Sequence, residues 1–339
     1  MPMLEVNNLK THFKTQDGVV KSVDGVSFSL EPGETLGIVG ESGSGKSVTA
    51  LSVMQLNPKP PVEYPEGEII FDGRNLLEVP EREMQKIRGN DIAMIFQDPM
   101  TSLNPVFTVG NQISEAIRIH QHVSKGEAKK KTVQVLKDVG IANPERRAGE
   151  YPHQFSGGMR QRAMIAMGLS CNPKVLIADE PTTALDVTIQ AQILDLMIDL
   201  QEKYGTAIVM ITHDLGVVAQ IADKVMVMYA GRAVEQGPTE PIFYDPLMPY
   251  SWSLLRSLPR LDTAGEVRLL PIKGSPPSLI FLPDGCNFSP RCPFVKAECH
   301  TTDPALVEKR PDHSAACILS VEEIEAEKRR VEQELGVQR

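Results

Sequence analysis

Near the start of the 339-residue chain, a glycine-rich stretch contains residues of the types that bind phosphate. This stretch fits the phosphate-loop pattern G-x-x-x-x-G-K-S/T and reads Gly40-Glu41-Ser42-Gly43-Ser44-Gly45-Lys46-Ser47. Its glycines let backbone N–H groups approach phosphate oxygens, and a helix that starts there adds partial positive charge. Lys46 would then reach the β- and γ-phosphates, and Ser47 would ligate Mg²⁺. The stretch predicts a nucleotide-binding site.

Two acidic residues follow a second apolar stretch. Residues 175–178 read Val-Leu-Ile-Ala and are followed directly by Asp179 and Glu180. A carboxylate at the C-terminal end of a buried strand beside a phosphate loop can hold Mg²⁺, and we assign this role to Asp179. Glu180 could polarise the attacking water. An apolar run before Asp-Glu is as often purely structural, but its place behind a phosphate loop favours catalysis.

The elements that must position these residues alternate along the chain. Apolar runs predict strands, and apolar spacing of the helical kind predicts helices between them. The strands are expected at residues 36–39, 67–73, 91–96, 175–178, 207–211, 224–229 and 231–236, and the helices at 47–54, 111–139, 157–169 and 189–201. This alternation implies a largely parallel sheet covered by helices. Residues 4–30 instead alternate apolar and polar positions, which predicts antiparallel strands and a hairpin. The charged stretch at 125–131 is interpreted as a solvated face or loop, and residues 321–335 are expected to form a highly charged, exposed helix.

Composition and charge narrow the class of protein. A chain with 41% hydrophobic residues can bury a full core, and its length suggests one large domain with an appendage. We expect no signal peptide and no membrane span, because the first residues lack the required pattern and no apolar run is long enough. A net charge of -9 argues against a nucleic-acid binder that relies on a general basic surface. The protein is expected inside the cell, and at a membrane only through partners.

Further motifs make the chain resemble the ATP-binding cassette (ABC) family. Phe155-Ser156-Gly157-Gly158-Met159 is similar to the family's signature motif, usually Leu-Ser-Gly-Gly-Gln, and departs from it at the first and last positions. Taken alone, Ser156 and two glycines that open a helix form a second anion-binding N-terminus. The resemblance implies a purpose for it: two cassettes pair head to tail, and Ser156, Gly157 and Gly158 of one close over ATP held by the other.

The resemblance also implies roles for single residues. Gln97 matches the glutamine that senses Mg²⁺ and water and faces the membrane partner, and His213 matches the histidine that contacts the γ-phosphate. Glu180 matches the catalytic glutamate, and Thr183-Ala184-Leu185-Asp186 resembles the dimer-contact loop that follows it. Phe13 is a candidate for stacking on adenine, with an ordinary core position on a strand as the equal alternative.

Four of the five cysteines crowd into a Pro-rich tail at positions Cys286, Cys292, Cys299 and Cys317. In a reducing compartment such crowding favours metal or cluster ligation over disulfides. Four thiolates can hold tetrahedral zinc or an iron–sulfur cluster, and the wide spacing without paired C-x2-4-C knuckles suits the bulkier cluster. His300 and His313 could also bind zinc, which keeps that alternative open. Cys171 stands apart and is interpreted as packing.

The tail itself resembles the C-terminal extension of oligopeptide and dipeptide importer ATPases. Residues 244–251 read Tyr-Asp-Pro-Leu-Met-Pro-Tyr-Ser and are similar to the His-Pro-Tyr-Thr motif that opens this extension, with departures at Met248 and Ser251. The resemblance implies a 4Fe–4S cluster on the four cysteines. It also implies a second cassette, identical or paralogous, two transmembrane permeases, and indirectly an extracellular solute-binding protein, all at the cytoplasmic face of the cell membrane.

Together these motifs predict an α/β protein with an ABC-type phosphate-loop ATPase core. That core has a mainly parallel sheet, an antiparallel β subdomain and an α-helical subdomain, and a small Cys-rich extension follows it. The expected boundaries are 1–256 for the nucleotide-binding domain, with its helical subdomain at about 98–170, and 257–339 for the extension. The expected function is ATP hydrolysis that drives peptide import. A nickel or other small-solute importer is the alternative, and a soluble non-transport ABC protein is less favoured because no sustained heptads are present.

Overall fold

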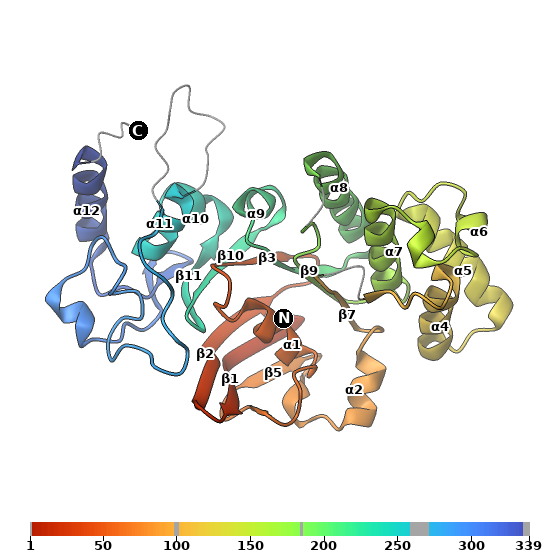
Figure 1. Ribbon diagram of the computed structural model, residues 1–339, viewed down its shortest axis with the longest axis horizontal. Coiled ribbons are helices and arrows are strands. Elements are labelled where there is room, and N and C mark those ends of the chain that lie inside the picture. The colour runs from red at the N-terminus through yellow and green to blue at the C-terminus, as the bar shows by residue number, and fades with distance from the viewer. Residues whose placement is uncertain (1, 98–101, 184–185, 258–270, 335–339) are drawn as a thin grey trace.

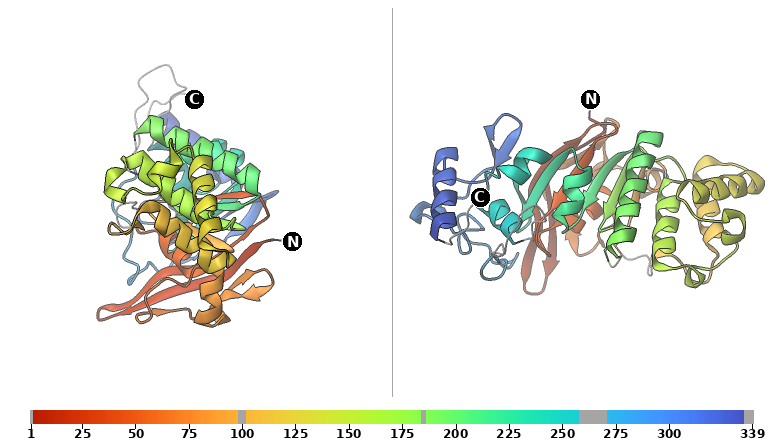
Figure 2. Two further views of the ribbon diagram at one scale, coloured as in Figure 1. Left: turned by 90° about the vertical axis from the view of Figure 1, so that its right-hand side faces the viewer. Right: turned by 90° about the horizontal axis from the view of Figure 1, so that it is seen from above.

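The fold is taken from a computed structural model, which describes residues 2–97, 102–183, 186–257 and 271–334 (Figure 1). Two sheets occupy the middle of an elongated molecule. The helices α4 to α7 gather at one end and the C-terminal residues, drawn in blue, at the other (Figures 1 and 2). No helix in the described part of the chain is long and apolar enough to cross a membrane.

The larger sheet has eight strands in the order β12-β13-β11-β10-β3-β9-β8-β7. Its parallel strands are β3 (Thr35–Val39), β7 (Ile92–Ile95), β8 (Val175–Asp179), β9 (Ala207–Ile211) and β10 (Lys224–Tyr229). Strands β3, β8 and β9 are buried at every position, as continuous apolar runs in a sheet covered on both faces should be. Parallel strands end at one edge, so the segments after β3, β7, β8 and β9 emerge side by side.

The smaller sheet is antiparallel and lies below the larger one in Figure 1. It consists of β1 (Leu4–Thr15), β2 (Gly18–Leu30), β4 (Val62–Glu63), β5 (Glu68–Phe71) and β6 (Arg74–Asn75). The helix α1 (Lys46–Val53) contacts β1 and β2 of this sheet and β8 of the larger one. The helix α2 (Glu81–Ile87) and the 3-10 turn Leu76–Glu78 complete this part. The hairpin expected at residues 4–30 is confirmed as β1 and β2.

Helices cover the other face of the large sheet. Alternate residues of β8 point to opposite faces of the sheet. Val175 and Ile177 pack toward α1, whereas Leu176 and Ala178 pack with α7 and α8. These covering helices are α7 (Gly157–Leu169), α8 (Val187–Tyr204) and α9 (Leu215–Ile221). The α/β fold class predicted from the sequence is therefore confirmed.

The helical region differs from the sequence prediction in one respect. The single helical stretch expected at 111–139 is two helices, α4 (Val109–Gln121) and α5 (Lys125–Asp138). His122 takes a φ of 51°, which ends α4, and Ser124 starts α5 with a capping box to Glu127. The charged stretch 125–131, interpreted as a solvated face or loop, is the start of α5. The short helix α6 (Pro144–Arg147) and the 3-10 turn Pro152–Gln154 lead into α7.

The C-terminal residues extend the large sheet instead of standing apart from it. The strand β11 (Arg232–Pro238) pairs with β13 (His313–Ala315), which pairs with β12 (Val307–Arg310). The remaining helices are α10 (Thr239–Tyr244), α11 (Pro249–Arg256), α12 (Val321–Glu334) and the 3-10 turn Ala297–His300. The charged helix predicted at 321–335 was expected to be exposed, but α12 buries Ile324 against Trp252 and Phe294. Residue 335 lies outside the described residues, and the domain boundary expected between residues 256 and 257 stays a prediction.

Candidate functional site

The phosphate loop joins β3 to α1, and its backbone requires glycine at two positions. Gly40 and Gly45 have φ values of 150° and 104°. A Cβ on Gly40 would lie 2.2 Å from the carbonyl oxygen of Met228, and one on Gly45 would lie 2.3 Å from that of Ser22. The loop is therefore wedged between β10 and β2, where no side chain fits. This close packing fixes the backbone around the start of α1.

Lys46 lies folded across the loop that precedes it. Its Nζ atom donates to the carbonyl oxygens of Gly40 (2.8 Å) and Glu41 (3.0 Å). Burial lowers the pKa of the ammonium, against the attraction of the Glu180 and Asp179 carboxylates. The Ser44 hydroxyl is buried in the same loop and has no hydrogen-bond partner among the residues that the structure describes. An unsatisfied hydroxyl and a buried cation at a helix start fit the phosphates of a nucleotide.

Hard oxygen ligands for a cation lie next to the loop. The Ser47 hydroxyl donates to Oδ1 of Asp179 across 3.0 Å, which joins the start of α1 to the end of β8. Asp179 is 6% exposed, and burial raises the pKa of its carboxyl. A hydroxyl and a carboxylate oxygen are ligands that Mg²⁺ accepts, and a divalent cation would stabilise the ionised carboxylate.

Glu180 forms the centre of a polar cluster at the same edge of the sheet. Its Oε2 accepts hydrogen bonds from Gln97 Nε2 and Thr183 Oγ1, both 2.9 Å away. Its Oε1 lies 3.2 Å from His213 Nδ1. Burial alone would raise the pKa of the Glu180 carboxyl, but Thr183, His213 and Gln97 outweigh burial and hold it below its ordinary value. Gln97 follows β7, Glu180 follows β8 and Thr212-His213 follows β9, so strand order alone brings them together.

The backbone of Glu180 is also unusual. It has a φ of 49°, which is uncommon for a residue other than glycine, and its N–H donates to the carbonyl oxygen of Ile211 on β9 (2.8 Å). The three predicted catalytic residues thus meet in one place. The contact from Thr183 was not foreseen, although a hydroxyl three residues after Glu180 is a local signal that could have predicted it.

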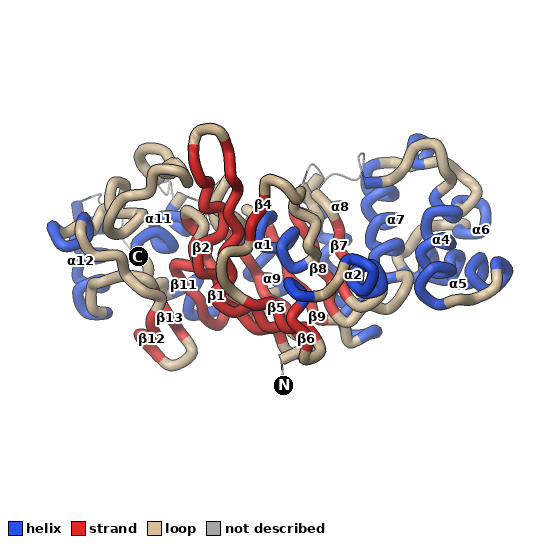
Figure 3. The backbone as a smooth tube through the Cα atoms, turned by 90° about the horizontal axis from the view of Figure 1, so that it is seen from below, coloured by secondary structure: helices blue, strands red, loops and turns tan. Residues whose placement is uncertain are grey.

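The signature motif lies elsewhere in the molecule. Ser156 caps α7 by accepting from the N–H of Met159 (3.3 Å), and Asp186 caps α8 by accepting from that of Ile189 (2.9 Å). Together with Gly157 and Gly158 they line one open hollow of about 520 Å³. In Figures 1 and 3 these helix starts lie well away from α1, so one chain does not bring the signature to its own phosphate loop.

Five other predicted positions remain to be placed. Phe13 is half-buried on β1, where it pairs with Val20 and Val62, and its contact with adenine stays a prediction. Ser42 and Gly43 form the exposed tip of the phosphate loop. Ala184 and Leu185 of the expected dimer-contact loop lie outside the described residues.

The four tail cysteines are free thiols that line one small apolar cavity, with Met248, Phe288, Phe294 and Leu319 among the residues around them. Burial raises the pKa of Cys292 to about 12 and of Cys317 to about 11. Among the described residues, no group of three or more His, Cys, Asp or Glu side chains is close enough to hold a metal ion. His313, considered as a zinc ligand, instead contacts Glu235 through Nε2 (2.7 Å). The described residues therefore show no metal site at these cysteines, either for zinc or for the expected iron–sulfur cluster.

Comparison with known proteins agrees with this geometry. Residues 23–183 match the ABC transporter family, and residues 234–299 match the oligopeptide/dipeptide transporter C-terminal region. The chain is 56% identical over 315 residues to a "Probable peptide ABC transporter ATP-binding protein" of Sinorhizobium fredii, covering 93% of this chain and 94% of that protein. It is 54% identical over 311 residues to the oligopeptide transport ATP-binding protein OppD of Bacillus subtilis, covering 92% and 87%.

A solved structure matches the core as well. The dimeric post-hydrolysis state of the ATP-binding cassette MJ0796, bound to ADP and Pi, aligns with a TM-score of 0.63 at 28% identity. The alignment covers 70% of this chain and 99% of that one. Sequence identity over nearly the whole chain, the shared fold and the acidic cluster beside the phosphate loop all lead to one conclusion: this chain belongs to the ABC transporter family and is one of its ATP-hydrolysing, ATP-binding proteins.

Proposed function

We propose that this chain is the ATP-hydrolysing subunit of a bacterial importer of oligopeptides or dipeptides. One observation supports ATP hydrolysis most directly: Gln97, Thr183 and His213 all contact Glu180 beside the phosphate loop. The peptide substrate rests on the printed names of the relatives and on the match of residues 234–299. A nickel or other small-solute importer remains the second candidate on the grounds of architecture.

The proposed mechanism uses groups that already lie in place. Lys46 exchanges its two carbonyl acceptors for the β- and γ-phosphate oxygens of ATP. Ser47, Asp179 and Gln97 offer oxygens to Mg²⁺. Glu180, ionised because its pKa is held low, accepts a hydrogen bond from the attacking water and aligns it for in-line attack. His213, with a side chain 62% exposed, turns from Glu180 toward the γ-phosphate.

A second cassette completes the site in this proposal. The hollow at Ser156, Gly158 and Asp186 closes over ATP on the partner's phosphate loop, and the partner is either an identical chain or a paralogue. Two permeases dock through the region of Gln97, whose neighbour in sequence, Phe96, is an exposed apolar side chain suited to a protein contact. Val106 and Phe107, further along the chain, are exposed apolar side chains as well. Docking to the permeases would place the chain at the cytoplasmic face of the membrane, with the solute-binding protein reached indirectly and no nucleic acid involved.

Transport in reconstituted vesicles tests this function. The chain is combined with its permeases, its partner cassette and the solute-binding protein, and uptake of a labelled peptide is followed with ATP present. Wild-type protein should drive uptake, and Glu180→Gln should bind ATP yet nearly abolish both hydrolysis and uptake. Uptake of nickel without peptide would favour the second candidate. ATP hydrolysis that no permease or solute alters would overturn the assignment to a transporter.

We propose in addition that Cys286, Cys292, Cys299 and Cys317 hold a 4Fe–4S cluster. In support, the four free thiols line one small apolar cavity, and four cysteine thiolates are the usual ligands of such a cluster. Anaerobically purified protein should contain about four irons and four sulfides per chain, the content of one such cluster. Cys292→Ser should lose them, whereas Cys171→Ser, outside the cavity, should keep them. One zinc per chain, or no metal, would overturn the cluster.

A further inference from the structure

A partly buried ion pair joins the C-terminal extension to the phosphate loop. Arg291, directly before Cys292, donates from Nη1 and Nη2 to the two carboxylate oxygens of Glu41, at 2.6 and 2.9 Å. Glu41 is the second residue of the phosphate loop, and the Arg291 side chain is only 4% exposed. Paired, charge-assisted hydrogen bonds of this kind fix orientation as well as position.

The backbone of Glu41 is held from the same side. Its N–H donates to the Tyr250 hydroxyl across 2.9 Å. Tyr250 is fully buried and packs on Tyr229 and Phe288, with ring centroids 4.6 and 5.3 Å away. Arg291 also donates to the Tyr229 hydroxyl (3.3 Å). An aromatic cluster drawn from β10, α11 and the extension therefore supports both ends of the contact to Glu41.

This contact reaches the nucleotide site through one residue. The carbonyl oxygen of Glu41 accepts from Lys46, so a shift of Glu41 moves an acceptor of the phosphate-binding lysine. The Glu41 carboxylate is also a negative charge beside a loop that must receive a triphosphate, and it attracts Lys46. Arg291 neutralises that charge and holds it away. Without Arg291, the carboxylate would be free to compete with phosphate for Lys46.

We propose that Arg291 is a positioning residue for nucleotide binding, which keeps the phosphate loop open by holding Glu41 and makes the C-terminal extension a working part of the ATP site. This inference rests on the proposed role of residues 40–47 in binding ATP. Arg291 need not touch the nucleotide. It acts through Glu41, and so it should govern affinity far more than the chemical step.

Steady-state kinetics and equilibrium binding of Mg·ATP to the full chain test the proposal. Arg291→Gln should raise the KM and Kd for ATP about tenfold, with kcat within about twofold. Arg291→Lys should lie between this variant and wild type, because one ammonium neutralises Glu41 but cannot hold both of its oxygens. The double variant Glu41→Gln/Arg291→Gln should bind ATP more tightly than Arg291→Gln alone, because it removes the competing carboxylate.

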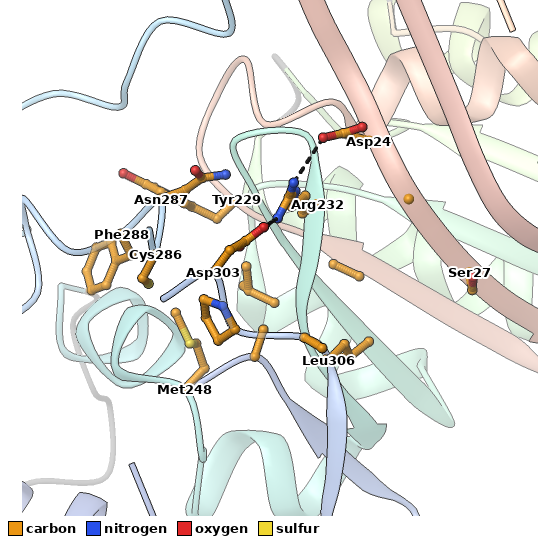
Figure 4. Close-up of a pocket in the computed structure, with 16 residues that line it drawn as sticks. Asp24, Ser27, Tyr229, Arg232, Met248, Cys286, Asn287, Phe288, Asp303 and Leu306 are labelled. Carbon is orange, nitrogen blue, oxygen red and sulfur yellow. Dashed lines mark hydrogen bonds and ion pairs between the residues drawn. The ribbon is translucent and has the colours of Figure 1, made fainter. Parts of the chain in front are cut away.

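A matched control distinguishes the specific effect of Arg291 on ATP binding from the effect of weakening any contact between the extension and the core. Arg232 bridges Asp24 of β2 (3.1 Å) and Asp303 of the extension (2.6 Å) at the wall of a cavity of about 370 Å³ (Figure 4). Asp303→Asn weakens this second bridge without touching Glu41, so its KM for ATP should match wild type.

The results of these measurements distinguish the role of Arg291 from the proposed function itself. An equal rise in KM for Asp303→Asn would replace the proposal with a general docking effect. An unchanged KM in Arg291→Gln, with wild type binding ATP normally, would overturn the inference and leave the proposed function standing. Wild-type protein that binds no ATP would overturn the function itself. If Arg291→Gln fails to fold, Arg291→Lys and the double variant make the same comparison.

Discussion

A few neighbouring residues set the pKa of the Glu180 carboxyl, and their effect can be measured as the pH dependence of ATP hydrolysis. Burial pushes the pKa of its carboxyl up, while Thr183, His213 and Gln97 pull it below the ordinary value. A water-polarising carboxylate works only when ionised, so activity should be present above this lowered pKa and lost as the pH falls through it. The site is therefore built to stay active into mildly acidic solution.

Removing one of these hydrogen bonds should move the acidic limb of the rate profile. Thr183→Val keeps the side-chain shape but deletes the donor to Glu180 Oε2. We expect the pKa of Glu180 to rise, so that kcat/KM falls at a higher pH than in wild type, by about one pH unit for a change of ~1.4 kcal/mol. The profile is measured from pH 4.5 to 9 with saturating Mg²⁺. An unshifted acidic limb would mean that another group controls it.

Much of the site at this scale could be predicted because its signals are local. The phosphate loop is eight consecutive residues, and Asp179 and Glu180 directly follow an apolar strand. Gln97 and His213 meet Glu180 because β7, β8 and β9 are adjacent parallel strands, a consequence of alternating strands and helices. The contact between Glu41 and Arg291, in contrast, spans 250 positions in the sequence. Both residues are of charged types that usually lie on the surface, so no local sequence pattern predicts their contact.

At the scale of elements, sequence periodicity found the longer strands of both sheets, but neither the short strands β4, β6, β12 and β13 nor the way in which the strands join. The apolar runs at β3, β8 and β9 were recognisable because strands covered on both faces must be apolar throughout. Helix ends were harder: α4 and α5 share one helical pattern, and only His122 and the cap at Ser124 separate them. That β13 would extend the large sheet could not be foreseen, because three residues carry too little pattern to identify a partner strand.

The joint between β11 and β13 contains a buried polar pair. Glu235 is 0% exposed and His313 is 1% exposed, with 2.7 Å between Oε1 and Nε2. Leu247 also donates its N–H to Glu235, so one carboxylate ties β11 both to the extension and to the segment before α11. Removing the imidazole would take one hydrogen-bond partner from the buried Glu235 carboxylate, which costs more than the pair itself contributes.

His313→Leu should therefore loosen the extension. We expect it to lower the free energy of unfolding by about 3 kcal/mol, because the Glu235 carboxylate is left buried without its imidazole partner. Trp252 is the chain's single tryptophan and lies in the core shared with α12, so its fluorescence reports on this region during urea denaturation. His300→Leu, at an exposed position, is the matched control and should unfold like wild type. Equal midpoints for both variants would contradict the role given to the buried pair.

At the scale of the whole molecule, one chain carries two helix starts that are predicted to bind phosphate and that do not face each other. The start of α1 contacts Asp179 at the end of β8, whereas the starts of α7 and α8 lie away from α1 (Figures 1 and 3). Ser156 and Asp186, at those two starts, line a separate hollow. A second cassette that supplies the missing half would explain both, with each chain giving its loop to one site and its signature to the other. Such a dimer would have two composite sites.

A mixing experiment tests this arrangement. Lys46→Ala breaks the phosphate loop, and Ser156→Arg places a bulky cation in the exposed hollow, so each variant alone should hydrolyse almost no ATP. In a mixed dimer, however, the intact loop of the Ser156→Arg chain faces the intact signature of the Lys46→Ala chain. Mixing equal amounts should restore about a quarter of wild-type activity, because about half of randomly formed dimers are mixed and each has one intact site of two. If the mixture stays inactive while wild-type chains alone hydrolyse ATP, each site must be built within one chain, and head-to-tail pairing of identical chains is wrong. If wild-type chains alone are inactive and gain activity only with a paralogous cassette, the same two variants are tested against that partner.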